Sequence, residues 1–218
     1  MMKTIDLYDL RRSIAGEYLS GFQFPWQALP GIRNLILTLG TNLGADYDEV
    51  RPRVWVHKTA IIAPGAWLGD SCIIGAGTEV RHGAFLRGSA LVGENCVVGN
   101  SVELKNAILF DDVQVPHFNY VGDSILGYKA HMGASAVTSN VKSDRSLVTV
   151  KNGEEILETG MGKLGAMLGD FVEVGCNSVL NPGTLVGKHS SIYPVSCVRG
   201  VVPANSIWKT GGVIVCKE

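Results

Sequence analysis

Large apolar residues recur at every sixth position over much of this chain. The spacing holds from Val56 to Phe110 and returns from Leu168 to Val198. Between these runs it continues with slips, through Val115, Val121, Leu126 and Met132. A period of six excludes an α-helix, which repeats every 3.6 residues. The residue two places before each large one is mostly small, so two inward positions lie two apart, as in a strand.

The hexads predict a solenoid of short strands. Three six-residue faces close one coil of 18 residues, and successive coils stack through strand ladders. The frequent Gly after each large residue marks the corners. Cys72 and Cys96 fall on small interior positions, which favours a structural role for both thiols over a reactive one. We expect an all-β domain over residues 51–218.

Residues 1–50 lie outside this repeat. Their apolar residues follow helical spacing, interrupted by the proline-containing stretch FPWQALPG. An open solenoid end exposes unpaired strand edges. We therefore expect a short helical N-terminal cap that covers the first coil.

Residues 141–165 interrupt the repeat a second time. Two alternating runs, 147–150 and 155–157, flank the sequence KNGE. An Asn-Gly pair between alternating runs is a hairpin signal. We expect a β-hairpin that projects from the solenoid, and loops of this kind often carry function.

Composition narrows the function classes. The 218 residues hold 19 Lys+Arg and 20 Asp+Glu, so net charge does not favour nucleic acid or anionic membranes. No apolar run is long enough to cross a bilayer, and the acidic N-terminal sequence is not a signal peptide. Five cysteines without a CxxC pair argue against a disulfide framework and fit a reducing cytoplasm.

Three cations, Arg81, Arg87 and Lys105, stand where a small residue usually follows the large one. Arg87 and Lys105 are 18 residues apart, one full coil, and should stack on one edge about 4.8 Å apart. A bound phosphate would offset their repulsion. Glu103 offers the alternative, a solvated and neutralised edge.

His117 lies where the strict period slips. A neutral imidazole is a competent general base near neutral pH, and the alternative is a corner histidine without chemical role. Zinc is a competing idea for His82 and His117, but no third ligand is evident, so we expect no metal.

Three blocks around these residues carry a family resemblance. They read VGNSVELK (98–105), HFNYVGD (117–123) and HMGASAVTSN (131–140). The chain resembles hexapeptide-repeat acyltransferases, and among them the glucosamine-1-phosphate N-acetyltransferase domain of the bifunctional UDP-N-acetylglucosamine pyrophosphorylase/acetyltransferase. The insertion is similar to archaeal versions, which accept glucosamine-1-phosphate and sometimes galactosamine-1-phosphate. A left-handed parallel β-helix and a homotrimer with sites at the subunit interfaces are implied by this resemblance alone.

The resemblance also implies residue roles. His117 would deprotonate the amine that attacks the acetyl-CoA thioester, with Glu103 orienting the histidine. Arg87 and Lys105 would hold the sugar 1-phosphate, and Tyr120 and Asn140 would contact the amino sugar. Acetyl-CoA would lie along a solenoid edge, near Cys176 and Pro194.

Some positions depart from the family pattern. His131 replaces an Asn, Val141 often a Tyr, and Cys176 a Ser. Nothing in these 218 residues matches the nucleotidyltransferase half. The sequence thus leaves three hypotheses: an amino-sugar 1-phosphate N-acetyltransferase, an acyltransferase for another acceptor, and a non-catalytic sugar-nucleotide-binding module.

Overall fold

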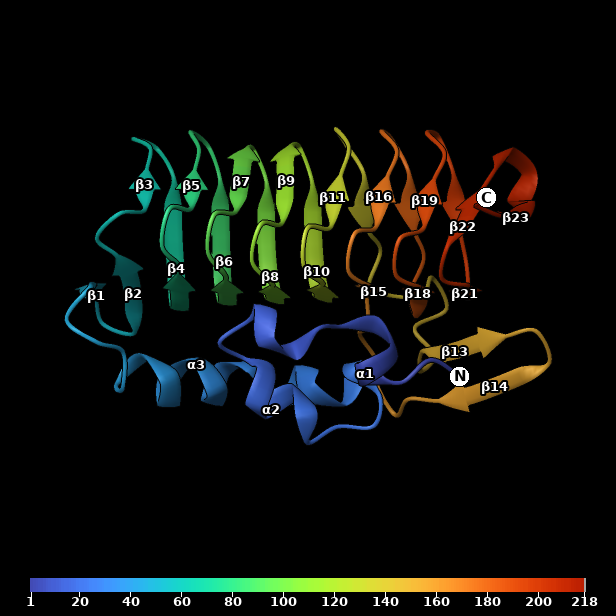
Figure 1. Ribbon diagram of the computed structural model, residues 1–218, viewed down its shortest axis with the longest axis horizontal. Coiled ribbons are helices and arrows are strands. Elements are labelled where there is room, and N and C mark those ends of the chain that lie inside the picture. Colours follow the sequence, from blue (N-terminus) through green and yellow to red (C-terminus); the bar gives the residue numbers. More distant parts are fainter. Residues whose placement is uncertain (218) are drawn as a thin grey trace.

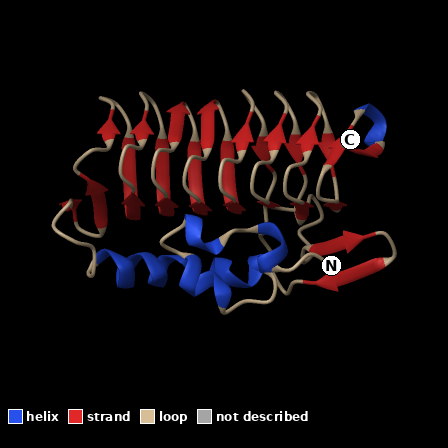
Figure 2. Ribbon diagram, in the orientation of Figure 1, coloured by secondary structure: helices blue, strands red, loops and turns tan. Residues whose placement is uncertain are grey.

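The chain folds into a left-handed parallel β-helix with a helical segment along one flank (Figures 1 and 2). This computed structural model describes residues 1–217. The predicted all-β solenoid is therefore confirmed. No helix among the described residues is long and apolar enough to cross a membrane.

Each coil presents three faces, which we call the first, second and third in chain order. The long strands turn the corner between the first and second faces. They are β4 (Trp67–Ile74), β6 (Phe85–Val92), β8 (Glu103–Leu109) and β10 (Tyr120–Leu126). Later coils split this unit into first-face strands β12 (Val137–Thr138), β17 (Val179–Leu180) and β20 (Cys197–Val198), and second-face strands β15 (Ala166–Leu168), β18 (Thr184–Val186) and β21 (Val201–Val202).

The third face is a separate sheet of short strands. Its parallel members are β3 (Ile61–Ile62), β5 (Glu79–Val80), β7 (Val97–Asn100), β9 (Gln114–His117), β11 (His131–Met132), β16 (Glu173–Val174), β19 (Ser191–Ile192) and β22 (Ser206–Trp208). At the two ends the added pairs are antiparallel: β1 (Tyr47–Arg51) on β2 (Val54–His57), and β23 (Ile214–Cys216) after the short helix η3 (Thr210–Gly212) on β22. The first coil is thus covered by β1.

Corner residues in the left-handed backbone region recur almost every sixth position. Most are Gly, Ser, Asn or Asp, which tolerate positive φ. Phe118, Phe171 and Val195 are bulky exceptions, at φ 53°, 58° and 58°. All three side chains are also exposed. Strained, exposed residues of this kind concentrate at functional sites.

Two first faces are one residue shorter than the rest. Corner residues Ser101 and Asn106 are five apart instead of six, and so are Phe118 and Asp123. As a result Leu109, not Phe110, pairs with Val92 in the interior ladder. The expectation that Phe110 continues the inward row was therefore wrong. Its buried ring instead lies 5.0 Å from the ring of Tyr8, in the helical segment.

The helical segment lies along the second face, not over the first coil. It comprises α1 (Thr4–Leu7), η1 (Leu10–Arg12), α2 (Gly16–Ser20), η2 (Pro25–Gly31) and α3 (Ile32–Gly40). Helix α3 packs against β4, β6 and β8, and η2 against β10. Residues 1–50 are mainly helical as expected, but their place corrects the prediction of a cap on the first coil.

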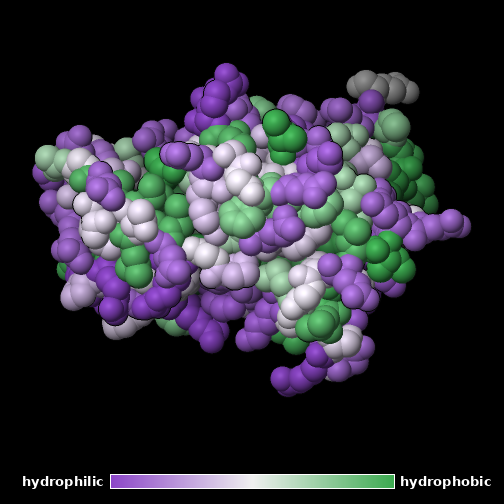
Figure 3. Space-filling model, turned by 90° about the horizontal axis from the view of Figure 1, so that it is seen from below, coloured by the Kyte–Doolittle hydropathy of each residue, from purple (hydrophilic) through white to green (hydrophobic). Residues whose placement is uncertain are grey.

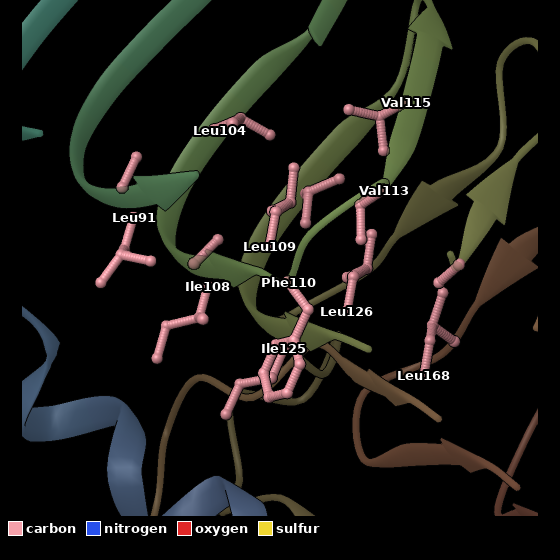
Figure 4. Packing of buried hydrophobic residues seen from close by; sticks show 14 of the residues in the cluster. Leu91, Leu104, Ile108, Leu109, Phe110, Val113, Val115, Ile125, Leu126 and Leu168 are labelled. Atoms are coloured by element: carbon pink, nitrogen blue, oxygen red, sulfur yellow. The ribbon is translucent and has the colours of Figure 1, made fainter. Parts of the chain in front are cut away.

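A row of outward apolar residues explains this position. Paired strands place Trp55, Ile73, Leu91, Ile108 and Ile125 in one ladder on the second face, and all are buried. Figure 4 shows Leu91, Ile108 and Ile125 on the side of the helical segment. Burial of each such side chain under the helical segment stabilises the fold by roughly 1.5–3 kcal/mol. Seen from this side, the molecular surface carries many hydrophilic residues over the helical segment (Figure 3).

The insertion forms the predicted hairpin. Strands β13 (Thr149–Asn152) and β14 (Glu155–Glu158) pair antiparallel, with Gly153 and Glu154 at the turn. The first strand begins and ends two residues later than the run 147–150. The hairpin lies beside the last coils, below β15 to β21 in Figure 1.

Candidate functional site

The outer side of the first face gathers most of the predicted site residues. Arg87 lies on β6, Glu103 and Lys105 on β8, and Tyr120 on β10. Tyr120 pairs directly with Glu103, and Asn140 follows β12 in the next coil. The short faces around Lys105 and Tyr120 therefore bring side chains from four coils together.

Asp123 is the centre of this cluster, and the sequence analysis missed it. The carboxylate is 3% exposed and accepts from the Lys105 Nζ at 2.8 and 2.9 Å. It also accepts from the amides of Asn106 at 2.9 Å and Asn140 at 2.6 Å. Four hydrogen bonds satisfy a buried charge that would otherwise be costly. The available signal was its corner position, 17 residues after Asn106 on two shortened faces.

Arg87 and Lys105 do not stack as the 18-residue spacing predicted. The register shifts after Leu86, so that Lys105 pairs with Gly88. Arg87 instead meets the Glu103 carboxylate at 3.3 Å, while Lys105 turns to Asp123. Each cation thus has its own carboxylate partner. The predicted stacking was wrong because the first face that holds Lys105 is one residue shorter than the face that holds Arg87.

Tyr120 is held within the same cluster. Its hydroxyl accepts a hydrogen bond from the Asn140 amide at 3.2 Å. Burial raises the pKa of Tyr120, and the nearby carboxylates of Asp123 and Glu103 raise it further. The phenol therefore stays protonated near neutral pH and can donate a hydrogen bond.

His117 ends β9 at the corner between the third and first faces. In the parallel ladder between β7 and β9, His117 pairs with Asn100, and the His117 side chain is exposed. The backbone there is fixed: the His117 N–H donates to the Asn119 side chain, and its carbonyl accepts from Ser135 N–H at 3.0 Å. Asn119 in turn donates to the Gly133 and Ala136 carbonyls. The corner therefore presents the imidazole from a rigid support.

The ring of His117 makes no hydrogen bond within residues 1–217. Glu103, predicted to orient it, pairs with Arg87 instead. Tyr120 follows His117 by three residues across this corner, and Asp123 lies at the opposite corner of the same short face, so the face links the imidazole to the polar cluster. The orienting role of Glu103 has no hydrogen bond to support it.

Cys176 and Pro194 lie on the same edge as His117, in later coils. The edge runs through the corners after β9, β11, β16 and β19. Asn177 N–H donates to Ala134 O, and Val195 N–H to Cys176 O, both at 2.9 Å. The Cys176 thiol is exposed. Large apolar side chains stand out along this edge: Phe118 (57% exposed), Tyr193 (43%) and Val195 (77%).

The remaining histidines lie apart from this cluster. His131 on the third face contacts the Glu173 carboxylate through Nδ1 at 2.7 Å. His82 Nδ1 lies 3.0 Å from the Pro64 carbonyl. Residues 1–217 contain no group of three His, Cys, Asp or Glu side chains arranged to hold a metal ion.

Comparison with known families matches the GMPPB C-terminal domain to residues 79–184. A bifunctional sugar-1-phosphate nucleotidylyltransferase/acetyltransferase from Sulfurisphaera tokodaii is 28% identical over 189 residues, covering 85% of this chain and 47% of that protein. The bifunctional protein GlmU of Methanocaldococcus jannaschii is 30% identical over 168 residues, covering 76% and 41%. The chain spans about half the length of such relatives, or less. A protein of Escherichia coli described as an uncharacterized acetyltransferase, YaiX, is 26% identical over 204 residues, covering 83% of this chain and 85% of that protein.

The comparison with solved structures gives matches of low similarity. Caulobacter crescentus PerB, in complex with CoA and GDP-perosamine, gives a TM-score of 0.35 at 16% identity, over 85% of this chain and 67% of that one. The Francisella novicida UDP-N-acetylglucosamine acyltransferase gives a TM-score of 0.42 at 14% identity, over 72% of this chain and 63% of that one.

Proposed function

Because the chain is a hexapeptide-repeat β-helix that resembles the acetyltransferase portion of bifunctional sugar-1-phosphate enzymes, we propose that it is an acetyl-CoA-dependent sugar N-acetyltransferase. The acceptor is an amino-sugar 1-phosphate, glucosamine-1-phosphate or galactosamine-1-phosphate. The observation that carries the proposal is that one short first face has His117 at one corner, the Asp123 cluster at the other, and Tyr120 between them. A cytoplasmic location belongs to the same proposal, since free cysteines fit a reducing compartment.

In the proposed reaction, His117 acts as general base. The acceptor amine attacks the thioester carbonyl, and its proton passes to the exposed imidazole. The tetrahedral intermediate collapses with breakage of the carbon–sulfur bond, which gives the N-acetyl sugar and CoA. Tyr120 and Asn140 hold the sugar, Arg87 contacts the phosphate, and Asp123 fixes Lys105 and Asn140 in place.

The apolar edge from Phe118 to Val195 suits the donor. A pantetheine arm combines amide groups with methylene groups, and the edge offers backbone groups beside apolar side chains. Cys176 and Pro194 lie on this edge and would line the arm. The thioester then meets the amine near His117.

One observation favours a second candidate, an acyltransferase for a nucleotide-linked amino sugar. Lys105 is held by Asp123, and Arg87 by Glu103, so each cation already has a carboxylate partner. The terminal phosphate of a sugar 1-phosphate must therefore compete with carboxylates for both cations. A nucleotide-linked amino sugar has an internal diphosphate instead of a terminal phosphate and would depend less on these two cations.

The test is release of CoA thiol from acetyl-CoA with glucosamine-1-phosphate, galactosamine-1-phosphate, a nucleotide-linked amino sugar or no acceptor. His117→Ala should lose at least about 100-fold in turnover, as expected for removal of a general base. His82→Ala is the matched control, since His82 occupies the equivalent corner two coils earlier. It should keep its rate. Release only with the nucleotide-linked sugar would select the second candidate, and CoA binding without any release would support a binding module.

A further inference from the structure

A pocket separate from the polar cluster lies between the insertion hairpin and the last coils. Its volume is about 410 Å³. The hairpin strand β13 forms one wall, and the corners after β17 and β20 form another. Trp208 and Ile214, from the end of the solenoid, provide an apolar wall.

Two glycines hold the hairpin close to the solenoid at this point. Gly183 and Gly200 have φ of 80° and 74°, which favours Gly. A Cβ at either position would stand 2.8 Å from Thr149 O or 2.7 Å from Lys151 O. The backbone of β13 therefore rests directly on two successive corners, and the pocket has a fixed shape.

The charges in the pocket are of one sign. Its charged lining residues are Lys142, Lys151 and Arg199, and no carboxylate lines it. Within residues 1–217, neither Lys151 nor Arg199 makes an ion pair, while the Lys142 Nζ donates to Ser146 Oγ and to the Leu147 carbonyl and lies 3.9 Å from Asp144. Like charges that line one pocket repel one another unless an anion binds between them. Arginine and lysine are the side chains that most often bind phosphate.

We propose that this pocket binds a nucleoside phosphate, with the phosphates on Lys151, Arg199 and Lys142 and the flat base against Trp208. The volume falls in the range of small-ligand sites. Indole rings stack well on bases. Asn181 and Thr149 add hydrogen-bonding groups to the same lining.

The pocket is close in the chain to the candidate site. Lys142 lies two residues after Asn140, which bonds to Asp123 and Tyr120. Two sources of the nucleotide fit this position: the nucleotide end of the acyl donor, or a free nucleotide bound beside the site. The inference rests on the proposed function only for the first source.

The experiment is calorimetric titration of the full chain with adenosine 3′,5′-bisphosphate, with inorganic pyrophosphate and adenosine as partial probes. The bisphosphate should bind, and Lys151→Gln/Arg199→Gln should weaken binding at least tenfold, since it removes two charge-assisted contacts to phosphate. Lys163→Gln, an exposed lysine of the insertion outside the pocket, is the matched control and should bind like the unchanged chain. Trp208→Phe should weaken the binding of the bisphosphate more than the binding of pyrophosphate.

A second titration at saturating acetyl-CoA separates the sources. If acetyl-CoA abolishes the heat of bisphosphate binding, the pocket belongs to the acyl donor. If the bisphosphate still binds, the pocket belongs to a free nucleotide. Absence of binding, or equal affinity in Lys151→Gln/Arg199→Gln, would overturn the inference. Because these are binding measurements, they stand apart from thiol release, which tests the proposed function.

Discussion

At the residue scale, Asp123 decides how the polar cluster is arranged. It is the shared acceptor for Lys105 and Asn106 from the preceding coil and for Asn140 from the following coil. Its four hydrogen bonds fix the positions of these three donor side chains. The side chains that would meet the acceptor sugar therefore depend on a residue that need not touch it.

Asp123→Asn should impair the cluster more than the fold. The substitution leaves the Lys105 ammonium without its charge partner, which is costly for a partly buried pair. We expect a loss of about 1–3 kcal/mol in the free energy of unfolding and a larger KM for the acceptor. Urea unfolding and steady-state kinetics measure the two effects.

Asp144→Asn, at an exposed carboxylate of the insertion, is the control and should change neither quantity. The double variant Lys105→Met/Asp123→Asn should recover part of the lost stability, because the unpaired charge is gone. A double variant as unstable as the two single losses added together would contradict the pairing.

The five cysteines divide by burial. Cys72 and Cys96 are buried and Cys176, Cys197 and Cys216 are exposed. Burial raises the pKa of Cys72 to about 11, and raises that of Cys96 further. A protonated, enclosed thiol is a poor nucleophile.

Ellman's reagent at pH 8 should therefore titrate three thiols in the folded chain and five after unfolding. Cys176→Ser should lower the first number to two. In the proposed donor site, acetyl-CoA should slow the reaction of Cys176. Reaction of all five thiols without unfolding would contradict the interior positions of Cys72 and Cys96.

At the scale of elements, the hexad rule predicted the coils but not what covers them. Inward positions have a fixed period, so Leu68, Leu86 and Leu104 were placed from the sequence alone. Outward positions such as Ile73 and Leu91 are also apolar, yet no period shows which segment packs on them. The helical segment therefore appeared as an end cap, although an outward apolar row on one face calls for a cover along the flank.

Ile108→Ala tests the contact between the helical segment and the second face. Ile108 is fully buried on the outward row, in the part of β8 beside α3. Removing its side-chain atoms should cost about 2–4 kcal/mol in the free energy of unfolding. Ile61→Ala is the control, since Ile61 is 63% exposed on the third face, and should cost less than about 1 kcal/mol. Equal losses in urea unfolding would contradict the buried interface.

The polar cluster shows the same limit. Motif positions gave His117, Lys105, Tyr120 and Asn140, and the structure brings the last three together. The prediction that Arg87 stacks on Lys105 was wrong because the shorter first face of the Lys105 coil shifts the strand register by one residue. A single-residue deletion is invisible to a rule that assumes 18 residues in every coil.

At the scale of the whole molecule, the three faces differ in what covers them. The second face carries the helical segment and the hairpin. The third face shows mainly polar side chains such as Glu79, Gln114 and Glu173. Within residues 1–217 no helix or hairpin packs on the first face, where Arg51 stacks over Trp67, and this face exposes Trp67 (57%) and Phe85 (40%) in one paired row beside the polar cluster. Exposed aromatic residues near a candidate site are typical of protein interfaces.

The family resemblance implies a homotrimer, and we propose that its subunit contacts lie on the first face. A neighbouring subunit on this face would bury Phe85 and enclose Arg87 and Glu103, which lie on adjoining strands. Light scattering should then give a mass three times the 23.3 kDa of one chain. Phe85→Glu should shift the mass toward one chain and reduce acetyl transfer in parallel, since an enclosed site needs its neighbour. Ile61→Glu places the same charge on the third face and should leave both unchanged. A single-chain mass with full activity would show that the open first face works alone.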